Sequence, residues 1–358
     1  MIRIRQGRVT KILTQHADVV DLMVAVEGLE QRAVNYTQLT GSVQVGDQVI
    51  LNTTAVHKKL GTGGNHFVIA NINNHSVDPA EAGHIMKLRY TPSQVKVLSV
   101  EEDDSPYADI MGRTTSLAGM PVVVATLHSM LPAVAAAIHR QSYGKLKVAY
   151  VMTDGAALPM AFSRMVKLLK GKNMIHSTIT CGHAFGGDYE AVNIYSGLIA
   201  ARAVAKADIA VVAMGPGIVG TGSKYGYTGL EQGQVVNAVH TLKGRAVAVP
   251  RISFADPRER HRGLSHHTRT ALGDVALAQC TVTIPLMEQS KNQLVANQLR
   301  DSGISNKHQI VQVDADSALQ ALSDAGIKVT TMGRTVEQDR EFFLAAGAAG
   351  IYSAKLFD

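Results

Sequence analysis

The first hundred residues alternate apolar and polar side chains over short runs, and glycine-rich turns separate these runs. A period of two residues is typical of half-buried β-strands. It predicts strands over residues 3–13, 19–26, 49–52 and 67–72, with two shorter ones over 85–90 and 95–100. Short strands at this spacing indicate a small β-barrel or β-sandwich domain over residues 1–100.

An acidic stretch follows this region. Residues 101–104 are all acidic, and Ser105-Pro106 is a turn signal. Runs of like charge are usually solvated, and Ser-Pro favours the start of a turn. We therefore interpret residues 101–118 as an acidic linker and lead-in to a second domain.

From residue 119 the pattern changes, because apolar runs of strand length now alternate with amphipathic stretches of helix length. Strands are predicted over 121–127, 147–152, 174–180, 208–214, 246–252, 281–284, 309–313 and 328–331. Helices are predicted over 132–140, 156–170, 189–206 and 265–279. Continuous apolar strands separated by helices indicate a mostly parallel sheet with both faces covered. The predicted fold is a doubly wound α/β domain over residues 119–358, with a TIM-barrel-like closed sheet as the alternative.

The overall charge is positive but does not by itself indicate nucleic acid. The chain of 358 residues carries a net charge of +6, has no tryptophan and contains only 5% aromatic residues. Its basic residues are mostly scattered, whereas single-stranded nucleic acid is typically bound by basic grooves with interleaved aromatic rings. Nucleic-acid binding is therefore disfavoured.

Cysteine usage and hydropathy predict a cytoplasmic location. Cys181 and Cys280 form no Cys-x-x-Cys pair, which favours a reducing compartment. Cys181 falls at a predicted strand end, where we expect a buried, inert thiol. The amino-terminal residues lack the apolar core of a signal peptide, and the longest apolar runs are too short to cross a bilayer. No membrane association is expected, and a homo-oligomer is left open.

Polar and ionisable residues gather after the predicted strands, and both candidate folds bind ligands at the carboxyl ends of parallel strands. Asp154 follows the second strand of this domain, and His183 and Asp188 follow the third. Together with His266 they are the candidate catalytic residues, because carboxylates and imidazoles move protons near neutral pH. Asp154 can equally cap the helix that follows it.

A glycine loop follows the fourth strand. It contains Gly215, Gly217, Gly220 and Gly222, and the first three fit the spacing G-x-G-x-x-G. Glycines let the backbone approach a phosphate closely. The match to a dinucleotide fingerprint is poor, because the next helix begins only near residue 229 and Arg251 stands where an acidic residue is usual. Arg251 would instead suit the 2′-phosphate of NADP, whereas the simpler interpretation is a loop that only needs turns.

The segment over residues 251–269 is rich in arginine. Five arginines face two acidic residues, a local excess of +3. Ser265 is a predicted N-cap, so His266 and His267 would open a helix. The candidate anion-binding residues of this segment are Arg251, Arg258, Arg260, Ser265 and His267. The alternative is a solvated loop of ion pairs.

The same segment suggests a metal site. His261 with Asp256 offers nitrogen and oxygen ligands that suit zinc, manganese or iron. His266 and His267 are predicted not to bind one ion together, because neighbours on a helix point about 100° apart. One of them is expected to join His128, His183 or Asp188 instead.

Four stretches of sequence resemble an uncharacterised protein family of Gram-positive bacteria. They are residues 51–56 (LNTTAV), 83–92 (GHIMKLRYTP), 182–188 (GHAFGGD) and 258–268 (RERHRGLSHHT). The resemblance covers essentially the whole chain. It implies a bacterial, non-secreted protein and no particular activity, so it assigns no catalytic residue.

The leading hypothesis is an enzyme that acts on a small anionic or phosphorylated molecule. Metal-assisted hydrolysis and NADP-linked redox chemistry both fit, so the expected cofactor is a divalent metal or a nucleotide. A non-catalytic small-molecule sensor, or a scaffold that interacts through its β domain, is the first alternative. A nucleic-acid-associated protein is the second.

Overall fold

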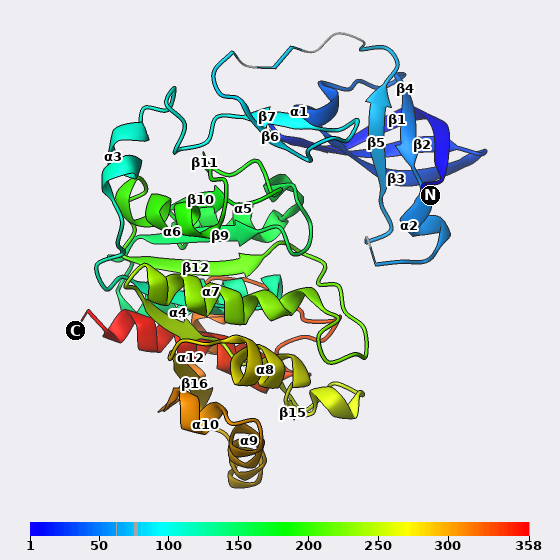
Figure 1. Ribbon diagram of the computed structural model, residues 1–358. Coiled ribbons are helices and arrows are strands. Elements are labelled where there is room, and N and C mark those ends of the chain that lie inside the picture. The colour runs from blue at the N-terminus through cyan, green and yellow to red at the C-terminus, as the bar shows by residue number, and fades with distance from the viewer. Residues whose placement is uncertain (62, 75–77, 80, 358) are drawn as a thin grey trace. The chain divides into compact units, whose positions relative to one another are not determined.

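The computed structural model describes residues 1–61, 63–74, 78–79 and 81–357. The chain divides into two compact units, Met1–Leu98 and Ser99–Asp358 (Figure 1). No helix in the described part of the chain is both long enough and apolar enough to cross a membrane.

The first unit is a closed five-stranded barrel with the strand order β1-β2-β3-β5-β4. Its strands are β1 (Ile4–Gln15), β2 (Val19–Val26), β3 (Leu29–Tyr36), β4 (Gln48–Asn52) and β5 (His66–Asn71). The antiparallel pair of β1 and β4 closes the barrel. This confirms the predicted barrel and excludes the sandwich. Two short helices, α1 (Thr37–Thr40) and α2 (Thr54–His57), and the hairpin of β6 (Ile85–Lys87) and β7 (Val95–Val97) complete the unit.

The second unit contains an open eight-stranded sheet with the order β11-β10-β9-β12-β8-β13-β16-β17. The strands are β8 (Pro121–Val124), β9 (Val148–Thr153), β10 (Ser177–Thr180), β11 (Tyr189–Glu190), β12 (Ile209–Met214), β13 (Arg245–Ala248), β16 (Thr281–Pro285) and β17 (Gln309–Val313). All of its neighbouring strands run parallel. The predicted parallel α/β sheet is therefore confirmed, and the TIM-barrel alternative is wrong because β11 and β17 are free edges.

Helices cover both faces of this sheet, and each face has its own apolar core. One core holds α4 (Leu131–Gln141), α5 (Arg164–Gly171), α11 (Asp316–Asp324) and α12 (Arg340–Lys355). The other holds α3 (Ala108–Arg113), α6 (Ile194–Ala203), α7 (Glu231–Thr241), α9 (Gln289–Asp301) and α10 (Ile304–Lys307). Short turns of helix lie at His128–Met130, Met160–Phe162, Thr228–Leu230 and Glu259–His261.

The boundaries of some predicted elements are wrong. Residues 328–331 form no strand, and Thr331 only bridges to Arg334. The helix predicted from residue 156 begins at Arg164, because Pro159 restricts the backbone before it and Ser163 caps the first turn. The helix predicted over 265–279 is α8 (His266–Thr270) followed by a π-helical turn, Ala271–Val275.

The chain order places a topological switch point at the carboxyl edge of the sheet. β8 and β12 are neighbours, yet β8 leads into α4 on one face and β12 leads towards α7 on the other. Such a switch point is where open α/β sheets bind ligands. The small hairpin of β14 (Ile252–Ser253) and β15 (Gly263–Leu264) follows the neighbouring strand β13. It presents the arginine- and histidine-rich segment at the same edge.

Candidate functional site

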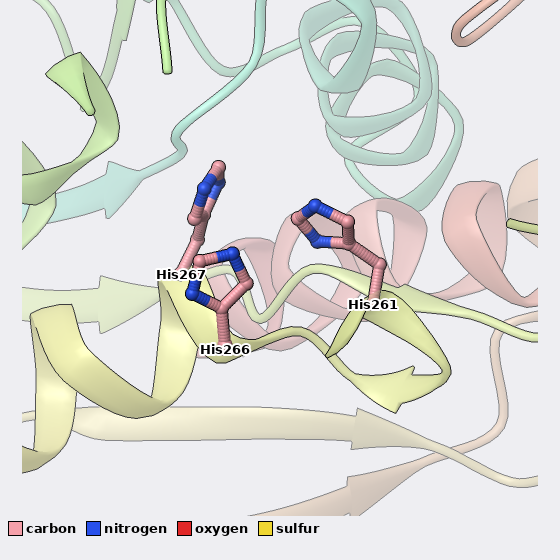
Figure 2. A group of neighbouring side chains, drawn as sticks. All are labelled: His261, His266 and His267. Carbon is pink, nitrogen blue, oxygen red and sulfur yellow. The ribbon is translucent and has the colours of Figure 1, made fainter. Parts of the chain in front are cut away.

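Three histidines come together beyond the β14–β15 hairpin. His261 ends a short helical turn between the two hairpin strands, and His266 and His267 open α8 (Figure 2). One ring nitrogen from each lies within 4.8 Å of the others. The centroids of the His266 and His267 rings are 4.3 Å apart. The prediction that these two neighbours could not face one ion is therefore wrong, because rotation of the side chains overcomes the 100° between their Cα–Cβ bonds.

Ser265 and Tyr227 orient two of the rings. The Ser265 hydroxyl accepts a hydrogen bond from the His267 backbone N–H, which confirms the predicted N-cap. The same Oγ lies 2.7 Å from His261 Nδ1. Tyr227 stacks on the His267 ring at 3.8 Å and donates its hydroxyl proton to the His267 carbonyl. The cluster is thus built into the packing of α8.

Two imidazole nitrogens of this cluster are buried without a hydrogen-bond partner among the described residues: His266 Nε2 and His267 Nδ1. Burial, followed by nearby positive charge, lowers the pKa of His261 and of His267 to about 3. The same two causes lower the pKa of His266. All three rings are therefore neutral at pH 7, which is the state in which imidazole binds a metal.

Removal of the N-cap is a direct test of this arrangement. Ser265→Ala is expected to lower the free energy of unfolding by about 1 kcal/mol, because the His267 N–H loses its acceptor. Urea denaturation measures this loss. Ser163→Ala is a matched control. Ser163 is also the N-cap of a helix, α5, and its hydroxyl also contacts a histidine, His128. A change below about 0.3 kcal/mol at Ser265 alone would show that the cap contributes little.

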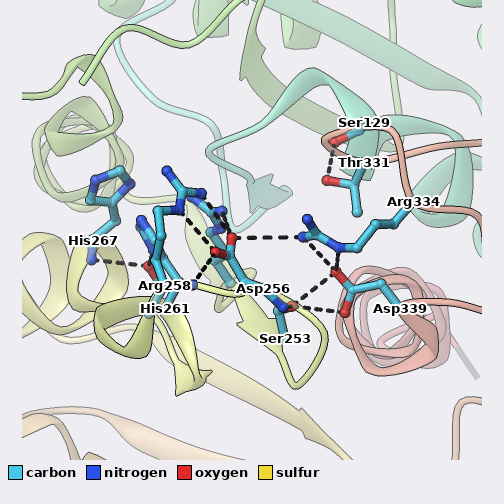
Figure 3. Close-up of polar contacts among 11 residues, drawn as sticks. Ser129, Ser253, Asp256, Arg258, His261, His267, Thr331, Arg334 and Asp339 are labelled. Carbon is cyan, nitrogen blue, oxygen red and sulfur yellow. Dashed lines mark hydrogen bonds and ion pairs between the residues drawn. The ribbon is translucent and has the colours of Figure 1, made fainter. Parts of the chain in front are cut away.

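A buried ion-pair network lies beside the histidines (Figure 3). The Asp256 carboxylate accepts hydrogen bonds from both arginines. Arg251 Nη2 donates at 3.0 Å, and Arg258 donates from Nη2 at 2.8 Å and from Nε at 2.9 Å. Burial alone would raise the pKa of Asp256, but the hydrogen bonds and charge of Arg258 hold it well below its usual range. Asp256 is therefore committed to the arginines and does not join the histidines, contrary to its predicted pairing with His261 as a metal ligand.

The network continues towards the end of β8. Arg334 Nη2 lies 2.8 Å from Asp339 and 3.7 Å from Asp256, and Ser253 donates to Asp339 at 2.8 Å. Three guanidinium groups, of Arg251, Arg258 and Arg334, thus share two carboxylates, which leaves one positive charge in excess. The Arg251 side chain is only 3% exposed, whereas that of Arg258 is 40% exposed. Of the predicted anion-binding arginines, Arg258 is accessible within the network, Arg251 is enclosed by it, and Arg260 lies exposed at the surface.

The glycine loop folds back on itself and reaches the histidines. Gly220 bridges Tyr227, and Thr221 N donates to the Gly226 carbonyl at 2.8 Å. A side chain at Gly220 would lie 3.7 Å from the His267 ring. Gly217 adopts a φ of +99°, which favours glycine, and Gly222 is exposed. Because this hairpin separates the glycines from α7, the strand–glycine turn–helix arrangement of dinucleotide sites is not formed.

Glu231 is a further ionisable residue at the carboxyl edge. Thr153, the last residue of β9, donates its hydroxyl proton to Glu231 Oε1 at 2.7 Å. Burial, and then the charge of Asp154, raise the pKa of Glu231 to about 7, although the Thr153 bond opposes this shift. The next residue, Gln232, bonds the carbonyls of Val124 and Val249 at the ends of β8 and β13. These bonds fix the first turn of α7 over the ends of β8 and β13.

The remaining predicted residues are spread along the sheet. Asp154 accepts the His183 backbone N–H at 2.9 Å, so these two lie together at the ends of β9 and β10. Asp188 instead pairs with Lys170 at 2.5 Å and accepts the N–H of Thr178, near the amino end of β10. The structure therefore does not place Asp188 at the carboxyl edge. His128 contacts Tyr150 and Ser163 and does not join the histidine cluster.

Comparison with known protein families identifies the family of this chain. The sequence model of a family described as "Protein of unknown function (DUF3866)" matches residues 32–350. The chain belongs to the DUF3866 family. No curated protein and no solved structure matches it. Membership in a family of unknown function agrees with the resemblance seen in the sequence, and it assigns no role to any residue.

The sequence alone did not indicate Glu231, Tyr227, Arg334 or Asp339. Glu231 lies 17 residues beyond the end of β12, after the glycine hairpin. Arg334 and Asp339 lie outside the clusters of polar residues from which the candidate site residues were predicted. A conserved spacing between these residues and the histidines is the kind of signal that would have shown them.

Proposed function

We propose that this protein is an enzyme that binds a small anionic, phosphorylated molecule at the carboxyl edge of the eight-stranded sheet. The observation that carries the proposal is the partly buried carboxyl group of Glu231. It lies at the carboxyl end of β9, holds a hydrogen bond from Thr153, and has a pKa raised to about 7. A carboxyl group with that pKa can both give and accept a proton at neutral pH, as a general acid–base catalyst must.

The charge of the neighbouring network supports an anionic substrate. The Arg258 side chain is 40% exposed, while Asp256 fixes the plane of its guanidinium through two nitrogens. A fixed guanidinium of this kind is suited to phosphate and carboxylate groups. The single excess positive charge of the network also favours an anion. In this proposal Arg258 binds the substrate and Glu231 moves the proton, with the exposed Asp154 beside it.

The proposed setting is the cytoplasm of a Gram-positive bacterium. Its support is the resemblance of the four sequence stretches, together with two buried cysteines that form no disulfide. In a reducing compartment thiols are not oxidised to disulfides. A phosphorylated metabolite is a substrate that such a compartment supplies.

The pH dependence of stability tests the state of Glu231. A carboxyl group whose pKa is raised on folding favours its protonated form in the folded state, so its contribution is unfavourable above the unfolded pKa. Stability should fall as the pH rises from 4.5 to about 7, by at most about 3 kcal/mol from this group. Glu231→Gln should remove this dependence and be more stable than the natural chain at pH 8, but not at pH 4. Urea denaturation at several pH values measures it.

The control for that series is Glu259→Gln, a change at an exposed carboxyl group in the same unit. It should leave the pH profile unchanged. An equal profile for the natural chain and Glu231→Gln would show that Glu231 is not held protonated, and the acid–base assignment would then be withdrawn.

Activity is tested with defined probes, namely inorganic pyrophosphate and p-nitrophenyl phosphate. Each is expected to raise the melting temperature, and Arg258→Gln should weaken this effect about tenfold or more. Release of phosphate should fall at least about 100-fold in Glu231→Gln while probe binding remains. Binding without turnover in the natural chain would favour the non-catalytic sensor. The absence of any thermal shift would exclude a phosphate-binding enzyme.

A further inference from the structure

The structure assigns a metal site to the three-histidine cluster: we propose that His261, His266 and His267 bind one zinc ion. This inference goes beyond the proposed function, because it depends on the cluster alone and not on Glu231 or on any reaction. The three histidines lie in a short helical turn and in the first turn of α8, within 7 consecutive residues from His261 to His267 (Figure 2).

The distances between the donor atoms suit one ion. The three ligand nitrogens lie within 4.8 Å of one another. In a tetrahedral zinc site with Zn–N bonds of about 2.0–2.1 Å, the nitrogens are roughly 3.4 Å apart. Rotation about the side-chain torsions can bring the three nitrogens to this spacing.

The hydrogen bonds identify which nitrogens are available. His266 Nε2 and His267 Nδ1 are buried and lack a hydrogen-bond partner within the described residues. Such orphaned polar atoms are costly unless something satisfies them. His261 Nδ1 is held by Ser265 Oγ, so its Nε2 is the atom that is left for an ion. A hydroxyl that fixes the second nitrogen of a metal-binding histidine is a common outer partner.

The chemistry of the donors favours zinc over magnesium or calcium. Three neutral imidazoles form a nitrogen-only set, whereas magnesium and calcium prefer oxygen ligands. Three protein ligands are also the number found in catalytic zinc sites, which keep the fourth position open. Asp256 does not supply that fourth ligand, because Arg251 and Arg258 occupy its carboxylate.

The same arginines determine what fills the fourth position. The Ser265 N–H donates to the Arg251 carbonyl, and Arg258 shares Asp256 with Arg251, so both arginines lie beside the cluster and their charges would oppose a bare divalent cation. An anion in the open position would offset this repulsion and contact Arg258 as well. Zinc and phosphate are therefore expected to raise each other's affinity by the same factor, since such coupling is reciprocal. This extension rests on the proposed function, whereas zinc binding itself does not.

Metal analysis of the full chain tests the site. The protein is purified without a polyhistidine tag, stripped with a chelator, dialysed against zinc and then analysed for metal. We expect one zinc per chain, a rise in melting temperature on zinc addition, and loss of at least about 100-fold in affinity in His266→Gln. His240→Gln, at an exposed histidine near the end of α7, is the matched control and should bind zinc normally.

A measurement on the natural chain keeps the test independent of any variant. X-ray absorption of the zinc-loaded protein should show three imidazole nitrogens around the ion. Substoichiometric zinc after dialysis, or a ligand shell that lacks three imidazoles, would overturn the assignment. So would full zinc binding by folded His266→Gln.

A measurement with inorganic phosphate separates the metal site from the proposed function. Zinc affinity is measured with and without inorganic phosphate, in the natural chain and in Arg258→Gln. An increase of about tenfold that Arg258→Gln abolishes would support the anion as the fourth ligand. Zinc binding that phosphate leaves unchanged would keep the metal site and overturn only the shared anion. Loss of turnover in Glu231→Gln concerns the proposed function alone.

Discussion

Asp256→Ala is expected to destabilise the protein by about 3–5 kcal/mol, which is among the largest effects of any single change we propose. The Arg251 side chain is only 3% exposed, and its guanidinium pairs with Asp256 at 3.0 Å. Removal of the carboxylate leaves that buried charge without its partner, and the desolvation of an unpaired ion is costly. Burial already lowers the pKa of Arg251 to about 10 in the presence of Asp256.

Urea denaturation of Asp256→Ala and Asp274→Ala measures this cost against a matched control. Asp274 pairs with Lys224 at 3.0 Å, but both side chains are about half exposed. Pairs of this exposed kind contribute about 0–1 kcal/mol. Similar losses in the two variants would mean that the Asp256 network behaves as an exposed ion pair and does not hold the β14–β15 segment in place.

Gly233→Ala is expected to cost about 2–3 kcal/mol, although alanine is the better helix former. Gly233 lies in the first turn of α7, where a methyl group would be 2.4 Å from the Ala271 carbonyl and 2.8 Å from the Ala276 nitrogen. Both obstacles are backbone atoms, one in the π-helical turn that continues α8 and one in the residue directly after it. The helix that carries His266 and His267 would therefore have to shift, so zinc affinity should fall together with stability.

Gly112→Ala is the control for this change. Gly112 also lies within a helix, α3, but a methyl group there would meet nothing within 4 Å. It should be neutral or add about 0.5–1 kcal/mol of stability. If denaturation shows that alanine is equally well tolerated at both positions, the close approach of α7 to the π-helical turn does not constrain the fold.

The sequence was most informative where one physical rule decides the local structure. β2 spans the predicted residues 19–26, because its buried and partly exposed positions alternate along the whole strand. β3 was not predicted, because its first half is mostly exposed and its second half is buried, which hides the period of two. Residues 328–331 are apolar enough for a strand, but the sheet already ends at β17. Which strands a sheet accepts depends on tertiary packing that the local pattern does not contain.

For the candidate site, the sequence identified the segments that form it but not which of their side chains contact one another. The arginine–histidine segment and the glycine loop do meet, at Gly220 and His267. Asp188 was misplaced because Gly186 and Gly187 let the chain turn back, so that Asp188 pairs beside Thr178. Glu231 was missed because its raised pKa comes from burial in the folded chain and from the charge of Asp154, and the burial of a helix start cannot be read from its own residues.

The closed barrel has a consequence for how the molecule can be shortened. The family match begins at residue 32, inside β3, and so omits β1 and β2. Yet β1 pairs with both β2 and β4, and β2 pairs with β3. A truncated chain that starts at residue 32 would keep a three-stranded remnant with two open edges and with Val49 and Leu51 uncovered. Unprotected edges of this kind recruit other strands, so self-association would replace folding of this unit.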